Sequence, residues 1–207
     1  MTGIADKIMK RVRSHGRGKL VCTPKDFLDL GGRAAVDQAL SRLVTAGQLR
    51  RVGRGLYDMP RISGVLKRPA PVNVDAAIAA IARRDNVRIM PDGMAAANQL
   101  GLTNAVPAKA SYVTDGATKT FKIDGRTIRL RHARPSVMHW AGKSSASVVQ
   151  ALRWLGPGAA DDAQIVATLK RRLPASVKRD IIKNCRDLPG WAAPVARSLM
   201  NDQHAAA

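Results

Sequence analysis

Residues 23–60 read TPKDFLDLGGRAAVDQALSRLVTAGQLRRVGRGLYDMP, and this order predicts a helix, a tight turn, a second helix and a two-stranded basic ribbon. Thr23 suits the N-cap of the first helix, and Pro24 suits its first position because the missing N–H would be unpaired there. Gly31 and Gly32 have no Cβ and so permit the sharp turn. The whole pattern is typical of a winged helix-turn-helix, which reads duplex DNA.

The second helix is predicted over residues 33–46, with its end at Gly47. Apolar residues at i, i+4, i+7 and i+8 predict one buried stripe, made of Val36, Leu40, Leu43 and Val44. The opposite face is polar, as in an ordinary solvated helix or in a helix that reads the major groove. In the second case Arg pairs with guanine and Gln with adenine, and residues near the helix start usually reach the bases. We therefore predict base contacts from Arg33, Asp37 and Gln38, and contacts nearer the phosphates from Ser41 and Arg42.

The segment 48–59 predicts two short strands joined by a turn at Gly53-Arg54-Gly55. Arg50, Arg51 and Arg54 make this ribbon cationic, and such residues grip phosphates or enter the minor groove. Charge on a hairpin can also simply protect a sheet edge from pairing. Three arginines within five residues, beside a helix-turn-helix, favour DNA contact. We predict that Lys25, in the first helix, joins them.

The formal charge of the 207-residue chain is +20, with no Glu among its acidic residues. Residues 1–68 hold 15 Lys and Arg against 5 Asp, whereas residues 69–207 hold 20 against 10, so charge is densest in the predicted DNA reader. A basic helix with Ile4, Ile8 and Val12 on one side precedes that reader. The aromatic fraction of 3% argues against recognition of single strands, which depends on stacking.

Pro69 and Pro71 disfavour helix and place a boundary near residue 70. We predict a winged helix-turn-helix domain over residues 1–68 and a mixed α/β domain over residues 72–200, an α+β fold overall. In the second domain the patterns predict strands at 87–90, 112–114, 120–123 and 127–131, and helices at 75–84, 94–100, 147–155, 161–173, 176–184 and 191–200. Three tryptophans, Trp140, Trp154 and Trp191, are expected in its core, and the tail 201–207 is expected to fray.

Other classes of protein have weaker support in the sequence. No apolar run approaches a membrane span and no signal peptide is seen, so a cytoplasmic location is expected. Cys22 and Cys185 are expected as free thiols, and the four His show no metal spacing, so we predict no metal, no cofactor and no catalytic residues. A Ser-His-Asp arrangement stays open because its spacing is unconstrained. The alternatives are a basic nucleic-acid-processing enzyme and a general RNA-binding module.

The arrangement resembles the AbiEi-like antitoxins of type IV toxin–antitoxin systems. The resemblance rests on the opening basic helix, the TPKDF…LGGR…ALSRLVTAGQLRRVGRGLYDMP block and the NQLGLTNAVPAKASYVTDG segment before paired strands. It implies an N-terminal winged helix-turn-helix, a larger α/β domain, and repression of the antitoxin's own operon at inverted repeats. It also implies that the protein opposes a nucleotidyltransferase-like toxin. A DNA-facing role carries over by position onto Arg33, Gln38, Arg42, Arg51 and Arg54.

One small winged domain covers a short half-site, and a single module buries on the order of 600–1,000 Å² of protein surface. That is little for tight binding at cellular salt. No heptad run predicts a coiled-coil dimer. We therefore expect a monomer or weak dimer in solution that binds a palindromic operator cooperatively.

Overall fold

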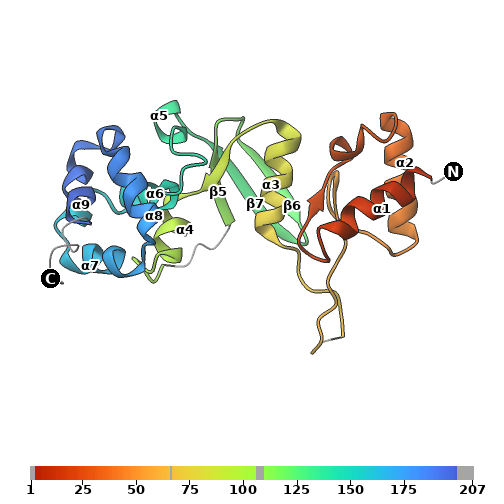
Figure 1. Ribbon diagram of the computed structural model, residues 1–207, viewed down its shortest axis with the longest axis horizontal. Coiled ribbons are helices and arrows are strands. Elements are labelled where there is room, and N and C mark those ends of the chain that lie inside the picture. Colours follow the sequence, from red (N-terminus) through yellow and green to blue (C-terminus); the bar gives the residue numbers. More distant parts are fainter. Residues whose placement is uncertain (1–2, 66, 106–109, 200–207) are drawn as a thin grey trace. The chain divides into compact units, whose positions relative to one another are not determined.

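A computed structural model describes residues 3–65, 67–105 and 110–199 of the chain (Figure 1). Contacts between Cα atoms divide it into two compact units. The first contains Met1–Val87 and Thr120–Ile128, and the second contains Arg88–Lys119 and Arg129–Ala207. About half of the residues are helical and 16% lie in strands, which confirms a mixed α+β fold.

The first unit begins with helices and strands in the order that the sequence predicted. They are α1 (Ile4–Ser14), β1 (Val21–Cys22), the 3₁₀ helix η1 (Pro24–Phe27), α2 (Arg33–Thr45), β2 (Arg50–Gly53) and β3 (Leu56–Asp58). The strands form an antiparallel sheet in the order β1-β3-β2, with Val21 and Arg50 both opposite Asp58. The predicted α2 stripe is buried at Val36, Leu40 and Leu43, together with Ala39, while Val44 is partly buried.

The start of η1 is held by side-chain capping. Asp26 Oδ2 accepts hydrogen bonds from the backbone N–H of Thr23 at 2.8 Å and from its hydroxyl at 3.2 Å. The predicted helix here is a short 3₁₀ turn instead of an α-helix, and it ends at Phe27. Because Thr23 is fully buried, the capping also satisfies polar groups that water cannot reach.

The reason predicted for the Gly31-Gly32 turn is wrong. Neither glycine has a positive φ, and Gly32 lies at φ −62° and ψ 155°, where any residue fits. The requirement at Gly31 is space, since an added Cβ would lie 2.7 Å from Cδ1 of Ile4 on α1. The turn therefore depends on the close approach of α1. Gly47, which follows α2, does adopt a positive φ of 67° as a helix-ending glycine does.

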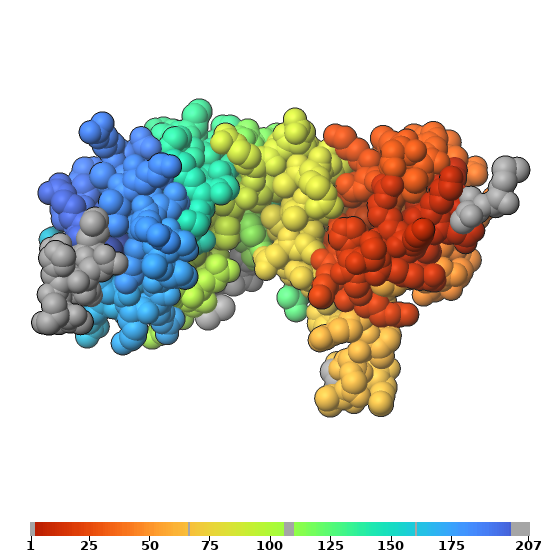
Figure 2. All heavy atoms as spheres, in the orientation of Figure 1, coloured from red at the N-terminus to blue at the C-terminus, as the bar shows by residue number. Residues whose placement is uncertain are grey.

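The first unit extends beyond residue 70. Residues 61–65 and 67–70 fold back on each other and protrude from the unit (Figures 1 and 2), with hydrogen bonds from Ser63 N to Arg68 O and from Ala70 N to Arg61 O. α3 (Val74–Asp85) then packs on β1. The predicted domain limits of 68 and 72 therefore differ from the unit limits, because the proline segment leads back to the first unit.

The tip of a later hairpin completes this unit. β6 (Lys119–Ile123) and β7 (Arg126–His132) are joined at Asp124-Gly125, where both φ angles are positive. The backbone N–H of Asp124 donates to the carbonyl of Val52 on β2 at 2.9 Å, and its carboxylate accepts from Val72 N at 3.0 Å. The outer edge of the β2–β3 ribbon is thus covered.

The second unit contains the remaining elements. They are β4 (Ile89–Pro91), α4 (Gly93–Gln99), β5 (Ala110–Thr114), α5 (Pro135–Met138), α6 (Ala146–Leu155), η2 (Pro157–Ala160), α7 (Ala163–Arg172), α8 (Ala175–Lys183), η3 (Cys185–Asp187), η4 (Gly190–Ala192) and α9 (Ala193–Ser198). The second sheet has the strand order β4-β5-β7-β6. The predicted strands and helices of this region are present with ends shifted by a few residues.

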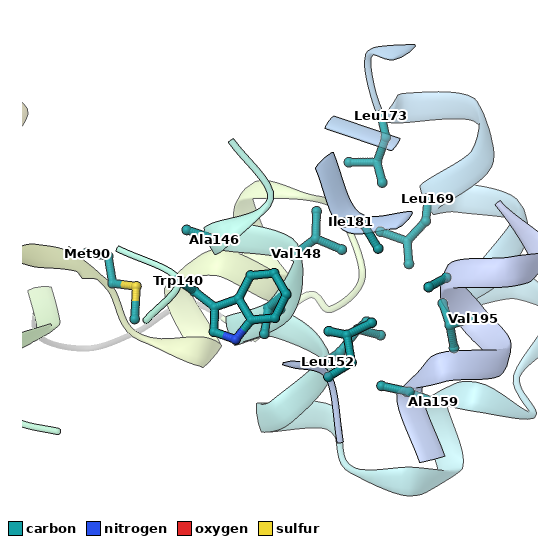
Figure 3. Packing of buried hydrophobic residues seen from close by; sticks show 14 of the residues in the cluster. Met90, Trp140, Ala146, Val148, Leu152, Ala159, Leu169, Leu173, Ile181 and Val195 are labelled. Carbon is teal, nitrogen blue, oxygen red and sulfur yellow. The ribbon is translucent and has the colours of Figure 1, made fainter. Parts of the chain in front are cut away.

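Trp140 lies at the centre of the second unit's core, where it is 1% exposed (Figure 3). Leu152 of α6, Leu169 of α7 and Val195 of α9 belong to the same buried cluster. Trp191 is partly buried against this cluster, as expected. The prediction for Trp154 is wrong: its residue is 41% exposed, because α6 buries Val148, Val149 and Leu152 on another side.

Both cysteines are free thiols, with Cys22 buried and Cys185 partly buried. Burial raises the pKa of Cys22 to about 12, and its thiol contacts the carbonyl of Tyr57 at 3.4 Å. Within the described residues, no helix is long and apolar enough to cross a membrane. Two predicted segments lie wholly or partly outside the described residues. They are the tail 201–207, with Met200 before it, and residues 106–109 of the NQLGLTNAVPAKASYVTDG segment.

Candidate nucleic-acid interface

The exposed side of α2 carries the polar residues that the helical period predicted. We call this surface the α2 face; it consists of Arg33, Gln38, Ser41, Arg42 and Thr45, all of which are exposed. A shallow groove of about 420 Å³ runs along it and is lined by Gln38, Ser41, Arg42, Thr45 and Ala46. The Thr45 hydroxyl donates to the carbonyl of Ser41 at 3.2 Å. Gln38 and Arg42 therefore present the freest donors on the α2 face.

Arg33 and Asp37 pair with each other at the start of α2. The Arg33 Nε donates to Asp37 Oδ2 at 2.8 Å, with side-chain exposures of 63% and 46%. Exposed pairs at this spacing are worth about 0.3–0.5 kcal/mol, so an incoming phosphate or base can replace the carboxylate at little cost. The Arg33 guanidinium therefore remains available to bind DNA, whereas the Asp37 carboxylate serves mainly to pair with Arg33.

Arg50 lies on the inner side of the β2–β3 ribbon, away from any interface. Its Nη2 and Nε bind the two carboxylate oxygens of Asp58 at 2.7 and 3.0 Å, and its Nη1 donates to the Ala70 carbonyl at 3.1 Å. The hydrogen bond to Asp58 raises the pKa of Arg50. Asp58 is only 2% exposed, so this guanidinium neutralises a buried charge. Strand alternation is the signal that could have found this, because Arg50 shares the face of buried Val52.

Arg51 and Arg54 have the opposite orientation and are exposed. Neither has a carboxylate partner among the described residues. The hairpin that carries them is supported by contacts with α3 and β6. Arg84 of α3 donates to the carbonyl of Arg54 at 3.2 Å, and an added Cβ on Gly53 would lie 2.9 Å from the Lys122 carbonyl of β6. Arg51 of β2 and Arg54 of the turn therefore lie on a supported end of the hairpin, which we call the ribbon turn.

Lys25 is exposed, but its ammonium group already has a partner. The Nζ donates to the carbonyl of Arg84 at the end of α3, at 3.2 Å. That long-range contact could not be seen in the sequence. This contact orients the Lys25 ammonium group toward α3 but uses only one of its three N–H donors.

Pairing separates two groups of arginines in the first unit. One group neutralises aspartates: Arg11 with Asp29, Arg33 with Asp37, Arg50 with Asp58, Arg83 with Asp26 and Arg84 with Asp85. Arg11 also lies 5.7 Å from the Phe27 ring centre, and its hydrogen bond lowers the pKa of Asp29. Arg42, Arg51 and Arg54 belong to the other group, which has no such partner in the described part of the chain. Arginines without a carboxylate partner among the described residues therefore lie on the α2 face and the β2–β3 ribbon, and also at Arg13, Arg17, Arg61 and Arg68.

Polar clusters in the second unit do not form a catalytic triad among the described residues. The Ser145 hydroxyl donates to Asp180 at 2.7 Å, and Ser144 donates to the same carboxylate. His139 instead lies 2.9 Å from Asp187, with Lys143 at 2.7 Å from the same ring nitrogen. No set of three His, Cys, Asp or Glu residues able to hold a metal ion occurs in the described ranges.

Comparison with known proteins places the chain in a family. Neither a curated protein nor a solved structure shows significant similarity to it. A family model matches residues 7–177, from α1 to the beginning of α8, and so covers both units. The chain therefore belongs to the family of unknown function DUF6088.

Proposed function

We propose that the protein is a duplex-DNA-binding autorepressor that acts as the antitoxin of a type IV toxin–antitoxin system. The observation that carries the DNA-binding part is the exposed α2 face, together with the exposed Arg51 and Arg54 of the ribbon turn, which have no carboxylate partner among the described residues. The order α1-β1-η1-α2-β2-β3, with its three-stranded sheet, supports a winged helix-turn-helix.

The α2 face suits a major groove. A helix about 10–12 Å in diameter fits a groove about 12 Å wide. α2 is 13 residues long and presents Gln38 and Arg42 on the side opposite its buried stripe. Gln can bind adenine and Arg guanine through paired hydrogen bonds. In this arrangement Gln38 and Arg33 read bases, and Arg42 lies nearer the phosphates.

The ribbon turn supplies contacts that do not depend on sequence. Arg51 and Arg54 are free to bind phosphates or to enter the adjacent minor groove. Arg50 is excluded from this role by its bonds to Asp58. The proposed interface therefore includes fewer arginines of the ribbon than the sequence predicted.

The antitoxin part of the proposal rests on the resemblance of the sequence to AbiEi-like proteins. It makes a nucleotidyltransferase-like toxin the protein partner and inverted repeats in the promoter the DNA partner. Binding to two half-sites is expected to be cooperative. Coexpression with a toxin encoded by the adjacent gene tests this part, because a true antitoxin restores growth.

Titration of full-length protein on its own upstream region and on a scrambled duplex, at physiological salt, tests the DNA-binding part. Gln38→Ala or Arg33→Ala is expected to weaken operator binding by about 1–3 kcal/mol and to affect scrambled DNA less. Gln164→Ala is the matched control, since Gln164 is an exposed glutamine on α7 of the second unit. Equal affinity of the parent protein for both duplexes would refute sequence-specific repression.

A further inference from the structure

A pocket of about 480 Å³ lies within the second unit, away from the residues assigned to DNA. Its walls come from the start of α4, from β5, from the end of β7, from α5 and from the end of α6. Small-molecule sites usually have volumes of about 300–1,000 Å³ and combine apolar walls with a few polar groups. Val113 and Val137 supply apolar wall here, and the polar groups are cationic.

Three arginines line this pocket: Arg131 and Arg134 on its rim and Arg153 of α6. No Asp lines it, and none of these guanidinium groups has a carboxylate partner among the described residues. The Nε of Arg153 is buried and has no hydrogen-bond partner there either. A buried donor without an acceptor destabilises the folded protein, and a charged donor does so more strongly. An anion bound in the pocket would supply acceptors for this donor and for the other guanidinium groups.

Trp154 adds a planar surface to the same pocket. The residue is 41% exposed, although its neighbours Leu152 and Ala151 are buried. α6 is fixed here by close contact with α4, because an added Cβ on Gly93 would clash with Trp154 Cβ and lie 2.6 Å from the Gln150 carbonyl. An exposed indole on a fixed helix can stack on a flat ring.

His132 is also held in a defined orientation. Its Nδ1 lies 3.0 Å from the carbonyl of Gly116, which can only accept, so Nδ1 carries the proton. The Nε2 atom is then left to bind a ligand. His132 also lines the pocket, beside Arg131.

We propose that this pocket binds a free nucleoside phosphate. Its phosphates would bind the guanidinium groups of Arg131, Arg134 and Arg153, and its base would stack on Trp154. Inorganic phosphate would bind the arginines but would make no stacking contact with the indole. A nucleoside would stack on the indole but would leave the arginines without an anion. A nucleoside phosphate is the common ligand class that carries both an anion and a flat ring. Because the pocket is concave, it fits a small molecule better than the convex backbone of a duplex.

The test is calorimetric titration of the full-length protein with each of the four ribonucleoside triphosphates. Saturable binding is expected for at least one of them, with at least about tenfold weaker binding to pyrophosphate and to the matching nucleoside. Arg153→Gln and Trp154→Ala should each weaken nucleotide binding by at least about tenfold. Arg171→Gln, an exposed arginine of α7 outside the pocket, is the matched control and should bind like the parent.

Three results would overturn the proposal. These are no saturable binding of any nucleotide up to about 1 mM, unchanged binding in both pocket variants, or a clear preference for a short oligonucleotide over every free nucleotide. Thermal unfolding of each variant checks that the fold is kept. Operator affinity measured on the same variants separates this site from the α2 face. If the parent protein does not bind the operator, the nucleotide-binding result still stands. If the parent binds no nucleotide, the DNA-binding result still stands.

Discussion

The two sides of the β2–β3 ribbon use arginine in opposite ways. On the inner side, Arg50 binds both oxygens of the buried Asp58. On the outer side, the adjacent Arg51 is exposed and has no carboxylate partner in the described ranges. Two adjacent residues of one type therefore differ: Arg50 neutralises a buried carboxylate, whereas Arg51 is left available to a ligand. The lesson is that pairing, not the number of arginines, marks the part of a basic surface that is open to a ligand.

The largest expected effect comes from breaking the inner pair. Arg50→Ala leaves the Asp58 carboxylate buried without its partner, and such a loss costs about 3–5 kcal/mol in the free energy of unfolding. Arg51→Ala, the matched control on the same strand, should change it by less than about 0.5 kcal/mol. Urea denaturation of the full chain measures both. Equal losses in the two variants would show that the two sides of the ribbon do not differ.

A smaller effect is expected on the outer side, in DNA binding. Replacing Arg51 and Arg54 by Ala should reduce the dependence of operator affinity on salt by roughly one logarithmic unit of slope per lost phosphate contact. The charge-balanced double variant Arg11→Ala with Asp29→Ala serves as control and should leave the slope unchanged, since that pair is already neutralised. If the ribbon variants leave the salt dependence of operator affinity unchanged, the ribbon turn does not contact the DNA phosphates.

The smallest effect concerns the exposed pair between Arg11 of α1 and Asp29, which follows η1. Hydrogen bonding from Arg11 lowers the pKa of Asp29 in the folded protein. A carboxylate with a lowered folded pKa stabilises the fold above its unfolded pKa of about 3.9 and loses that contribution as pH falls through the folded value. Asp29→Asn should therefore be slightly less stable than the parent at pH 6, and the difference should shrink at pH 3. Urea midpoints at the two pH values measure it, and a difference that grows in acid would contradict the assignment.

Most local structure could be predicted because it depends on neighbours in the sequence. The helical period of Val36, Leu40 and Leu43 defined α2 and its exposed side, and Gly47 ended it. The Asp124-Gly125 turn followed from residues that tolerate positive φ. Gln38, Ser41 and Arg42 are exposed for the same reason that the stripe opposite them is buried.

The rest depends on partners far away in the sequence. Lys25 is bound to the carbonyl of Arg84 on α3 and Arg50 to the carbonyl of Ala70, and no local pattern contains either contact. The connector contains Pro69 and Pro71, yet residues 61–65 and 67–70 fold back, and α3 then joins the first unit through Arg83 and Val21. The pocket beside Trp154 draws on five separate elements, so no stretch of sequence could indicate it.

Because Cys22 is buried, its thiol can serve as a probe for the rate at which the first unit opens. With a pKa of about 12, only about one thiol in ten thousand is ionised at pH 8, and the sulfur is enclosed as well. A thiol reagent must therefore wait until β1 separates from its neighbours. The labelling rate of Cys22, measured beside that of the more accessible Cys185, then reports how often the first unit opens, and ligand-bound and ligand-free protein can be compared on that scale.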